Sequence, residues 1–209
     1  MIFIHRGKIS KKTKENSLEG FKLSIAKGLN IETDIHFISD GSPVCYHDFS
    51  LLRINNLNRQ IKDLKFREIR KFRILELKKL IKILKKKTKI LIEVKPNLNK
   101  KTLNLFYKII KRNIKNIIII SFNEKNLIKL HNYKKKIKLG LCFNKSDKFK
   151  FIDSKKNKKH INFLVLDKSQ LNNKKIDKIK KIKFYYTIKN YKQIKRFKEK
   201  NLIVENILT

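Results

Sequence analysis

Short apolar runs rich in β-branched residues recur along the whole chain, and polar stretches long enough for a helix separate most of them. Runs of this kind are typical of strands that are buried on both faces. There are eight of them, at residues 2–5, 30–37, 89–94, 116–121, 137–143, 161–167, 182–187 and 201–206. Buried strands that alternate with helices favour a parallel α/β sheet, and this repetition constrains the fold more than any other feature.

The stretches between the runs carry helix signals. Residues 18–25 place apolar side chains at helical spacing, with Asn16 and Glu19 positioned as a capping box and Gly28 as a stop. Residues 77–84 repeat the apolar spacing with Leu and Ile. We therefore expect amphipathic helices that cover the sheet.

Eight strand and helix units are what a (β/α)8 barrel, or TIM barrel, requires, and 209 residues is short for that fold. We predict a single domain over residues 1–209: a short (β/α)8 barrel with a small hairpin at the "DGSP" turn after the second strand. The alternative is an open doubly wound sheet, but no GxGxxG motif comes after the first strand.

The chain is strongly basic, with a formal net charge of +38 from 55 Lys and Arg against 17 Asp and Glu. Its 41% hydrophobic residues exclude a disordered chain. A basic protein can bind nucleic acid by releasing counterions. Here the lysines are spread along the chain beside many Ile and Asn, all encoded by A/T-rich codons, and no zinc-finger or RNP-like motif occurs. We therefore predict no dedicated nucleic-acid partner.

The segment "LKKLIKILKKK" at 77–87 fits two interpretations. It could lie on an anionic membrane surface, or it could pack as an outer barrel helix with its lysines in water. We favour the barrel helix and expect at most weak association with anionic membranes. With no spanning apolar run, no signal-peptide pattern and only Cys45 and Cys142, the sequence predicts a cytoplasmic protein without a disulfide framework.

Acidic residues stand two apart on the predicted strands. Side chains alternate along a strand, so Glu32 and Asp34 share one face of the second strand, as Glu93 and Lys95 share one face of the next barrel strand. In a barrel these faces would point inward near the C-terminal strand ends. Three carboxylates there would repel one another, and Mg²⁺ or Ca²⁺ would relieve that repulsion. The alternative is that each acid pairs with a lysine.

Two of the five histidines lie at predicted strand ends. His5 is followed by Arg6, and His47 comes after the hairpin turn. Two imidazoles beside a metal suit acid and base chemistry near neutral pH, and Arg6 and Lys95 would attract an anionic substrate. His36 shares the face of the strand acids, and we interpret it as a residue that lines the site.

Several segments, taken in order, resemble the glycerophosphodiester phosphodiesterases of the phosphatidylinositol phospholipase C-like superfamily. They are "HRG" at 5–7, "ENSLEGF" at 15–21, "IETDIHFISDGSPVCYHD" at 31–48, "ILIEVKP" at 90–96, "IIIISFNEKNL" at 117–127 and "YYTIKN" at 185–190. The resemblance covers nearly the whole chain. It implies a barrel enzyme, a phosphoric diester hydrolase, that converts a small glycerophosphodiester to glycerol 3-phosphate and an alcohol with a divalent cation.

The resemblance also implies a role for each matching residue. The metal ligands would be Glu32, Asp34 and Glu93, the general acid–base pair His5 and His47, and the residues near the phosphate Arg6 and Lys95. We assign His5 as the base and His47 as the acid, with the reverse assignment as the alternative, and the attacking group as the substrate's own neighbouring hydroxyl. Other functions compatible with the sequence are another phosphodiesterase of the same superfamily and a basic nucleic-acid-binding protein.

The chain departs from the family pattern in three places, one of which is His36, where small or aliphatic residues are common in the family. Only 44 residues, 49 to 92, separate Asp48 from Glu93, so we expect the usual insertion to be reduced or missing. Near the C-terminus, Val204-Glu205-Asn206 stands where the family often has Thr-Asp. The sequence therefore specifies neither the alcohol head group nor the oligomeric state. Glu15 and Asn16 match the family by motif, and we interpret them as helix-capping residues.

Overall fold

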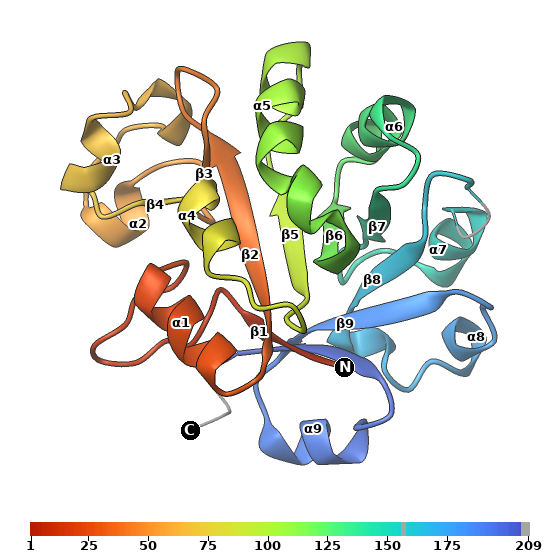
Figure 1. Ribbon diagram of the computed structural model, residues 1–209. Coiled ribbons are helices and arrows are strands. Elements are labelled where there is room, and N and C mark those ends of the chain that lie inside the picture. The colour runs from red at the N-terminus through yellow and green to blue at the C-terminus, as the bar shows by residue number, and fades with distance from the viewer. Residues whose placement is uncertain (156–157, 206–209) are drawn as a thin grey trace.

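Eight parallel strands close into a barrel in the computed structural model, which describes residues 1–155 and 158–205 (Figure 1). They are β1 (Ile2–His5), β2 (Asn30–Phe37), β5 (Ile90–Val94), β6 (Ile117–Ser121), β7 (Lys138–Cys142), β8 (Phe163–Asp167), β9 (Ile182–Ile188) and β10 (Asn201–Val204). Closure comes from β1, which pairs in parallel with both β10 and β2. The predicted (β/α)8 barrel is thereby confirmed, and the open doubly wound sheet is wrong. Residue 206, the last of the final apolar run, lies outside the described residues.

Helices surround the barrel in Figure 1. They are α1 (Leu18–Ala26), α4 (Leu77–Lys82), α5 (Lys100–Ile110), α6 (Glu124–Tyr133), α7 (Phe149–Lys155), α8 (Lys174–Asp177) and α9 (Tyr191–Arg196), with the 3-10 turns η2 (Lys111–Asn116) and η3 (Lys168–Gln170). Each of these seven helices buries at least one apolar side chain. The helices therefore hold the barrel from outside and leave its C-terminal end to the loops.

The core has two layers because strand side chains alternate between the two faces of the sheet. Ile4, Ile31 and Ile35 belong to the layer between barrel and helices, which is the larger one. Phe3 and Leu91 belong to a smaller cluster inside the barrel. The interior is thus apolar near the start of β1 and β5, and the next inward residue on each of these strands decides whether the barrel mouth is polar.

A small lobe is attached to the edge of β2. Strand β3 (Pro43–Cys45) pairs antiparallel with β2, after a turn in which Gly41 has φ +87°, and β4 (Leu75–Glu76) pairs antiparallel with β3. Between them lie α2 (Leu52–Asn55), η1 (Ile61–Asp63) and α3 (Glu68–Lys71). The lobe has its own buried apolar cluster, which includes Leu51, Ile61, Leu64 and Ile69. The predicted hairpin is present. The short segment that follows it in the chain, where the sequence indicated that the usual insertion is reduced or missing, forms a separate packing unit.

Two local predictions are wrong. The N-cap of α1 is Ser17, whose side chain accepts a hydrogen bond from the Gly20 N–H, so Asn16 and Glu19 form no capping box. The helix expected over 77–87 ends at Lys82. Ile83 and Leu84 still pack partly against the core after the helix ends, and the lysines 85–87 that follow them are exposed.

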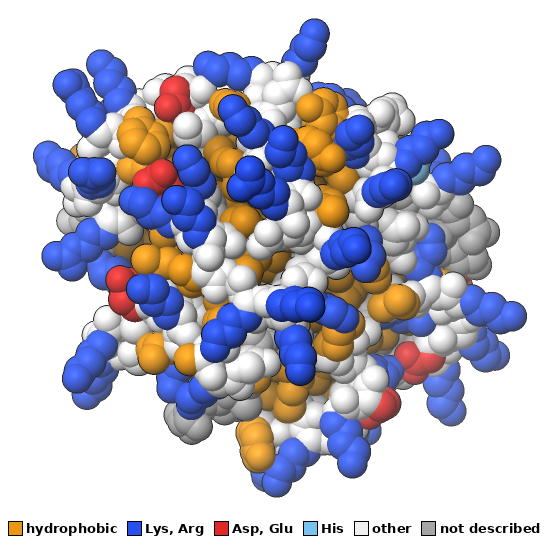
Figure 2. All heavy atoms as spheres, viewed as in Figure 1, with side chains coloured by type: hydrophobic (Ala, Val, Ile, Leu, Met, Phe, Trp, Pro, Cys, Tyr) orange, Lys and Arg blue, Asp and Glu red, His pale blue; other side chains and the backbone are white. Residues whose placement is uncertain are grey.

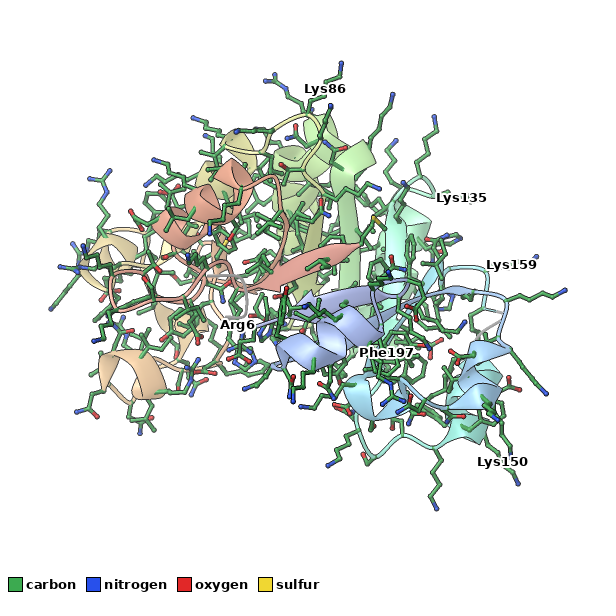
Figure 3. The ribbon with its side chains drawn as sticks, turned by 90° about the horizontal axis from the view of Figure 1, so that it is seen from below. Arg6, Lys86, Lys135, Lys150, Lys159 and Phe197 are labelled. Atoms are coloured by element: carbon green, nitrogen blue, oxygen red, sulfur yellow. The ribbon has the colours of Figure 1, made fainter. Side chains whose placement is uncertain are left out.

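The outer-helix interpretation of 77–87 fits the packing of α4, because Leu77, Leu80 and Ile81 are buried against the barrel. Lysine and arginine side chains are scattered over the whole face in Figure 2. Figure 3 shows Lys86, Lys135, Lys150 and Lys159 pointing outward. Over the described residues, we find no helix with the length and apolar character needed to span a membrane.

Candidate active site

The polar side chains gather at the C-terminal ends of β1, β2 and β5. Strand register places His5 opposite Glu32, and Asp34 opposite Glu93. Lys95 comes directly after β5, and its backbone N–H donates to the carbonyl of Ile35. Residues that are far apart in the chain thereby lie side by side, because parallel strands end at the same edge of the barrel.

Glu32, Asp34 and Glu93 each offer an oxygen, and these atoms all lie within 4.8 Å of one another. The Glu32 and Asp34 side chains are 3% and 1% exposed. Lys95 Nζ is 2.7 Å from Glu93 Oε1 and 3.1 Å from Asp34 Oδ1. The structure therefore brings together the three predicted metal ligands, and it also realises part of the alternative in which acids pair with a lysine.

The three carboxylates differ in electrostatic environment. Burial, together with the neighbouring Asp34 and Glu93, raises the pKa of Glu32 well above its ordinary value. Burial and Asp34 likewise raise the pKa of Glu93. Burial would also raise the pKa of Asp34, but Lys95 and Arg6 lower it. The cations of the chain therefore compensate Asp34 and leave Glu32 and Glu93 short of positive charge.

This charge balance tests whether the residues fit a metal ion. Asp34 Oδ1 is buried, and its contact with Lys95 lacks hydrogen-bond geometry, so this oxygen has no hydrogen-bond partner among the described residues. A set of carboxylate oxygens with unmet charge is the donor set that Mg²⁺ and Ca²⁺ prefer. The cluster therefore fits a hard divalent cation.

Arg6 and Asn16 hold the acids from the β1–α1 loop. Arg6 lies with φ 56°, and its backbone N–H donates to Glu32 Oε2 over 3.1 Å while its Nε is 3.2 Å from Asp34 Oδ2. Asn16 Nδ2 donates to the same Asp34 oxygen, and its Oδ1 accepts a hydrogen bond from Thr33. Figure 3 shows Arg6 among the inner side chains, unlike the labelled lysines. Asn16 is therefore a supporting residue of the site, and capping does not explain it.

His5 lies between two carboxylates without bonding to either. Its Nε2 is 3.9 Å from Glu32 Oε2 and its Nδ1 is 4.0 Å from Glu205 Oε2, distances too long for hydrogen bonds. Burial, and then the charge of Arg6, lowers the pKa of His5 to about 4. The imidazole is therefore neutral at neutral pH and can accept a proton.

His47 follows β3 by two residues; burial lowers its pKa, and it lies near enough to the acids for the charge of Asp34 to oppose that effect. Its Nδ1 donates to Asp48 Oδ1 over 2.6 Å, because a carboxylate oxygen can only accept. This bond selects the tautomer of His47 that carries its proton on Nδ1, so Nε2 remains available to exchange a proton. His36 Nε2 donates to the His47 carbonyl oxygen over 3.1 Å. His36 therefore supports the His47 backbone, a role beyond the lining role that the sequence indicated.

A small cavity of about 30 Å³ opens beside His5, Glu32 and Glu93. Its other wall is apolar and includes Phe122 and Tyr186, whose rings meet edge to face at 6.0 Å. The cavity therefore has a charged wall and an apolar wall, and its volume is that of about one water molecule.

The site contains residues that the sequence did not single out. Arg53 from the lobe pairs with Asp48 and Glu15, and Glu205 stands at the end of β10 near His5. Asp48 could have been found from its position directly after His47, and Glu205 was visible as a departure from the family pattern. No local pattern marks Arg53, because Asp48 lies five residues earlier, outside the spacing of a helical ion pair, and Glu15 lies 38 residues earlier.

A model of the Glycerophosphoryl diester phosphodiesterase family matches residues 5–205, which confirms the predicted class of enzyme, a phosphoric diester hydrolase. The chain belongs to the glycerophosphoryl diester phosphodiesterase family. None of the curated proteins matches the chain in sequence.

Solved structures with the same fold include three diesterases. A phosphodiesterase of Oleispira antarctica, solved in complex with the product sn-glycerol-3-phosphate, has a TM-score of 0.82 at 18% identity, over 98% of this chain and 92% of its own. The glycerophosphodiester phosphodiesterase of Thermotoga maritima has a TM-score of 0.76 at 24% identity, over 98% and 93%. That of Agrobacterium tumefaciens has a TM-score of 0.76 at 15% identity, over 99% and 97%. At these identities the likeness shows the fold.

Proposed function

We propose that the protein hydrolyses glycerophosphodiesters to glycerol 3-phosphate and a free alcohol, using Mg²⁺ or Ca²⁺. The observation that carries the proposal is the convergence of three buried carboxylates at the barrel mouth, with His5 3.9 Å from Glu32. Family membership supports the reaction class. The bound sn-glycerol-3-phosphate of the Oleispira neighbour supports the product.

The cation would be held by Glu32, Asp34 and Glu93, whose oxygens lie within 4.8 Å of one another. When bound, it would balance the carboxylates and withdraw charge from the phosphoryl oxygens. Arg6 and Lys95 border the same point, so their charges would orient the anionic phosphate toward it. Asn16 keeps Asp34 in place through its hydrogen bond.

The two histidines would move the protons. His5 has a pKa of about 4 because it is buried beside Arg6, so it is deprotonated and suits the base that accepts the proton of the attacking hydroxyl. Attack by the substrate's own hydroxyl would expel the alcohol and leave a cyclic glycerol phosphate, which a water molecule would then open to glycerol 3-phosphate. Burial lowers the pKa of His47, while Asp34 and the hydrogen bond to Asp48 oppose that effect. A carboxylate on Nδ1 stabilises the imidazolium, so His47 suits the acid that protonates the leaving alcohol. The reverse assignment is the alternative.

The same features indicate the partners. The substrate is a small phosphodiester, and its anionic charge would be attracted by the +38 surface. The scattered lysines would also give weak, salt-sensitive attraction to anionic membranes without a dedicated nucleic-acid site.

The proposal is tested with purified protein, a panel of glycerophosphodiesters that differ in alcohol, and Mg²⁺, Ca²⁺ or a chelator. We expect release of glycerol 3-phosphate with at least one cation and none with the chelator. Glu32→Gln should abolish the reaction while retaining salt-dependent binding to nucleic acid. Absence of hydrolysis of every diester with both cations would overturn the proposal.

A further inference from the structure

Arg53 lies in α2, the short helix that comes after His47 in the lobe, and its guanidinium contacts two carboxylates from different parts of the chain. Its Nε donates to Asp48 Oδ2 over 2.6 Å. Its Nη1 donates to Glu15 Oε2 over 3.0 Å, and Nη2 donates to Glu15 Oε1. Glu15 belongs to the β1–α1 loop, 38 residues earlier. One side chain therefore ties the lobe to the barrel.

Both carboxylates continue to residues of the site. Asp48 Oδ1 accepts from His47 Nδ1 over 2.6 Å. On the other side, both Glu15 oxygens are 3.4 Å from Arg6 Nη1. Arg53 thus stands in the middle of a continuous set of contacts that runs from His47 to Arg6.

We infer that Arg53 is a positioning residue: it holds Asp48 and Glu15, and through them it fixes the orientation of His47 and Arg6 across the mouth of the barrel. The inference rests on the proposed function of His47 for its effect on turnover. It assigns no contact between Arg53 and the substrate.

The packing of α2 shows why the contact matters. None of the four residues of α2 is fully buried, and of these four only Ile54 packs partly against the apolar cluster of the lobe, so apolar packing alone holds this helix weakly. Three donors of a rigid planar guanidinium meet three carboxylate oxygens, which sets the distance between lobe and loop. The Arg53 side chain is 50% exposed, so the ion pairs themselves add little to folding stability. Their consequence is orientation: without Arg53, Asp48 can rotate and the Nδ1–H tautomer of His47 is no longer selected.

The lobe offers a matched control. Arg59 pairs with both oxygens of Glu68, also partly in solvent, and neither residue reaches the site. Arg53→Ala and Arg59→Ala therefore remove the same kind of ion pair from the same lobe. Arg53→Lys keeps the charge and loses the fork, and it serves as the test variant if Arg53→Ala does not fold.

Steady-state kinetics separate the roles. For a diester with an alkyl alcohol, Arg53→Ala should lower kcat about 10–100-fold with little change in KM. Arg53→Lys should lower kcat by a smaller factor, and the kcat of Arg59→Ala should match that of the wild type. With a nitrophenyl diester, whose departure needs no acid, the Arg53→Ala loss should shrink. In the His47→Ala background, Arg53→Ala should cost little more.

Three kinetic outcomes would overturn the inference. A raised KM with unchanged kcat would make Arg53 a substrate-binding residue. If the loss of kcat from Arg53→Ala adds fully to the loss from His47→Ala, Arg53 does not act through His47. If Arg59→Ala lowers kcat as much as Arg53→Ala does, both arginines act only by stabilising the lobe.

A spectroscopic measurement tests the inference independently of turnover. Long-range ¹H–¹⁵N spectra at neutral pH should show His47 as the Nδ1–H tautomer in the wild type and Arg59→Ala, and as a tautomer mixture in Arg53→Ala. An unchanged His47 tautomer would overturn the inference even if the diesterase activity is real. A wild type that hydrolyses no diester would contradict the proposed function, while the tautomer result would still decide the role of Arg53.

Discussion

The two sides of the barrel interior are built on the same strand pattern but carry opposite chemistry. On β1, β2 and β5 the inward residues near the C-terminal ends are His5, Glu32, Asp34 and Glu93. On β6 to β9 most inward residues are apolar, among them Ile118, Ile120, Cys142, Phe163, Val165 and Phe184, and only the ends of β8 and β9 add the polar groups of Asp167 and Tyr186. The fold supplies the inward direction on both sides, and only the side chains decide which side can hold charge and react.

Strand β5 shows the difference within a single element. Leu91 belongs to the apolar interior cluster, and Glu93, two residues further on the same face, belongs to the carboxylate cluster. The interior is thus apolar at depth and polar at one part of the mouth. Substitutions on the polar side should act on turnover, and those on the apolar side should act on folding.

The largest expected effect on the polar side comes from the two histidines. His5→Ala and His47→Ala should each lower turnover by at least about 10²-fold, because each removes one proton transfer. His131→Ala and His160→Ala are the controls and should change turnover little, because neither histidine lies at the mouth. A nitrophenyl diester should restore His47→Ala and not His5→Ala. Restoration of His5→Ala instead would reverse the two roles, and full activity in both variants would remove them from the mechanism.

The matching change on the apolar side is Phe184→Ala. Phe184 is fully buried, and its ring lies 5.6 Å from that of Phe3 and 5.5 Å from that of Phe163. Removing it should cost about 3–5 kcal/mol of unfolding free energy. Turnover per folded molecule, measured after correction by denaturant titration, should stay within a few-fold of the wild type. A specific loss of turnover in fully folded protein would contradict the division between the two sides.

A smaller effect is expected outside the barrel. Lys78→Glu, Lys82→Glu and Lys86→Glu reverse exposed charges on and after α4. Turnover of a small soluble diester should fall only modestly, through weaker attraction of the anion, and the loss should disappear at high salt. A large loss that persists at high salt would give the basic surface a direct part in the reaction.

The smallest expected effect is the pH dependence of the Arg59–Glu68 pair. Hydrogen bonds from Arg59, and then from the Lys65 N–H, lower the pKa of Glu68 to about 2 from an ordinary 4.5. A carboxyl group with a lowered pKa stabilises the fold above its unfolded pKa and loses that effect as the pH falls toward 2. Thermal melts of the wild type and Glu68→Gln should therefore differ slightly above about pH 4.5 and converge toward pH 2. A difference that stays constant over this range would contradict the assignment.

Local patterns carried most of the fold because each barrel strand is a compact apolar run and each pairs with its neighbour in the barrel. They also placed Glu32, Asp34 and Glu93 on inward faces, since alternation along a strand is independent of the rest of the chain. The prediction failed at Asn16, because the residue type suits a helix cap, while the left-handed backbone at φ 52° aims its side chain at Asp34 instead.

Arg53 and His36 show the other limit. The Arg53–Glu15 contact joins the lobe to the β1–α1 loop, and the His36–His47 contact depends on the path of the chain after β3. No spacing rule in a single sequence encodes either contact. The same holds for α4, which ends at Lys82 although Ile83 and Leu84 still pack against the core and the lysine-rich continuation has good helix propensity.

The most direct measurement is a crystal structure of the protein with Mg²⁺ or Ca²⁺ and glycerol 3-phosphate. We predict one cation with oxygens of Glu32, Asp34 and Glu93 at about 2.0–2.6 Å, and the phosphate between that cation and the two histidines. A cation bound elsewhere, or a phosphate bound by surface lysines while Asp34 and Glu93 remain paired with Lys95, would contradict the account.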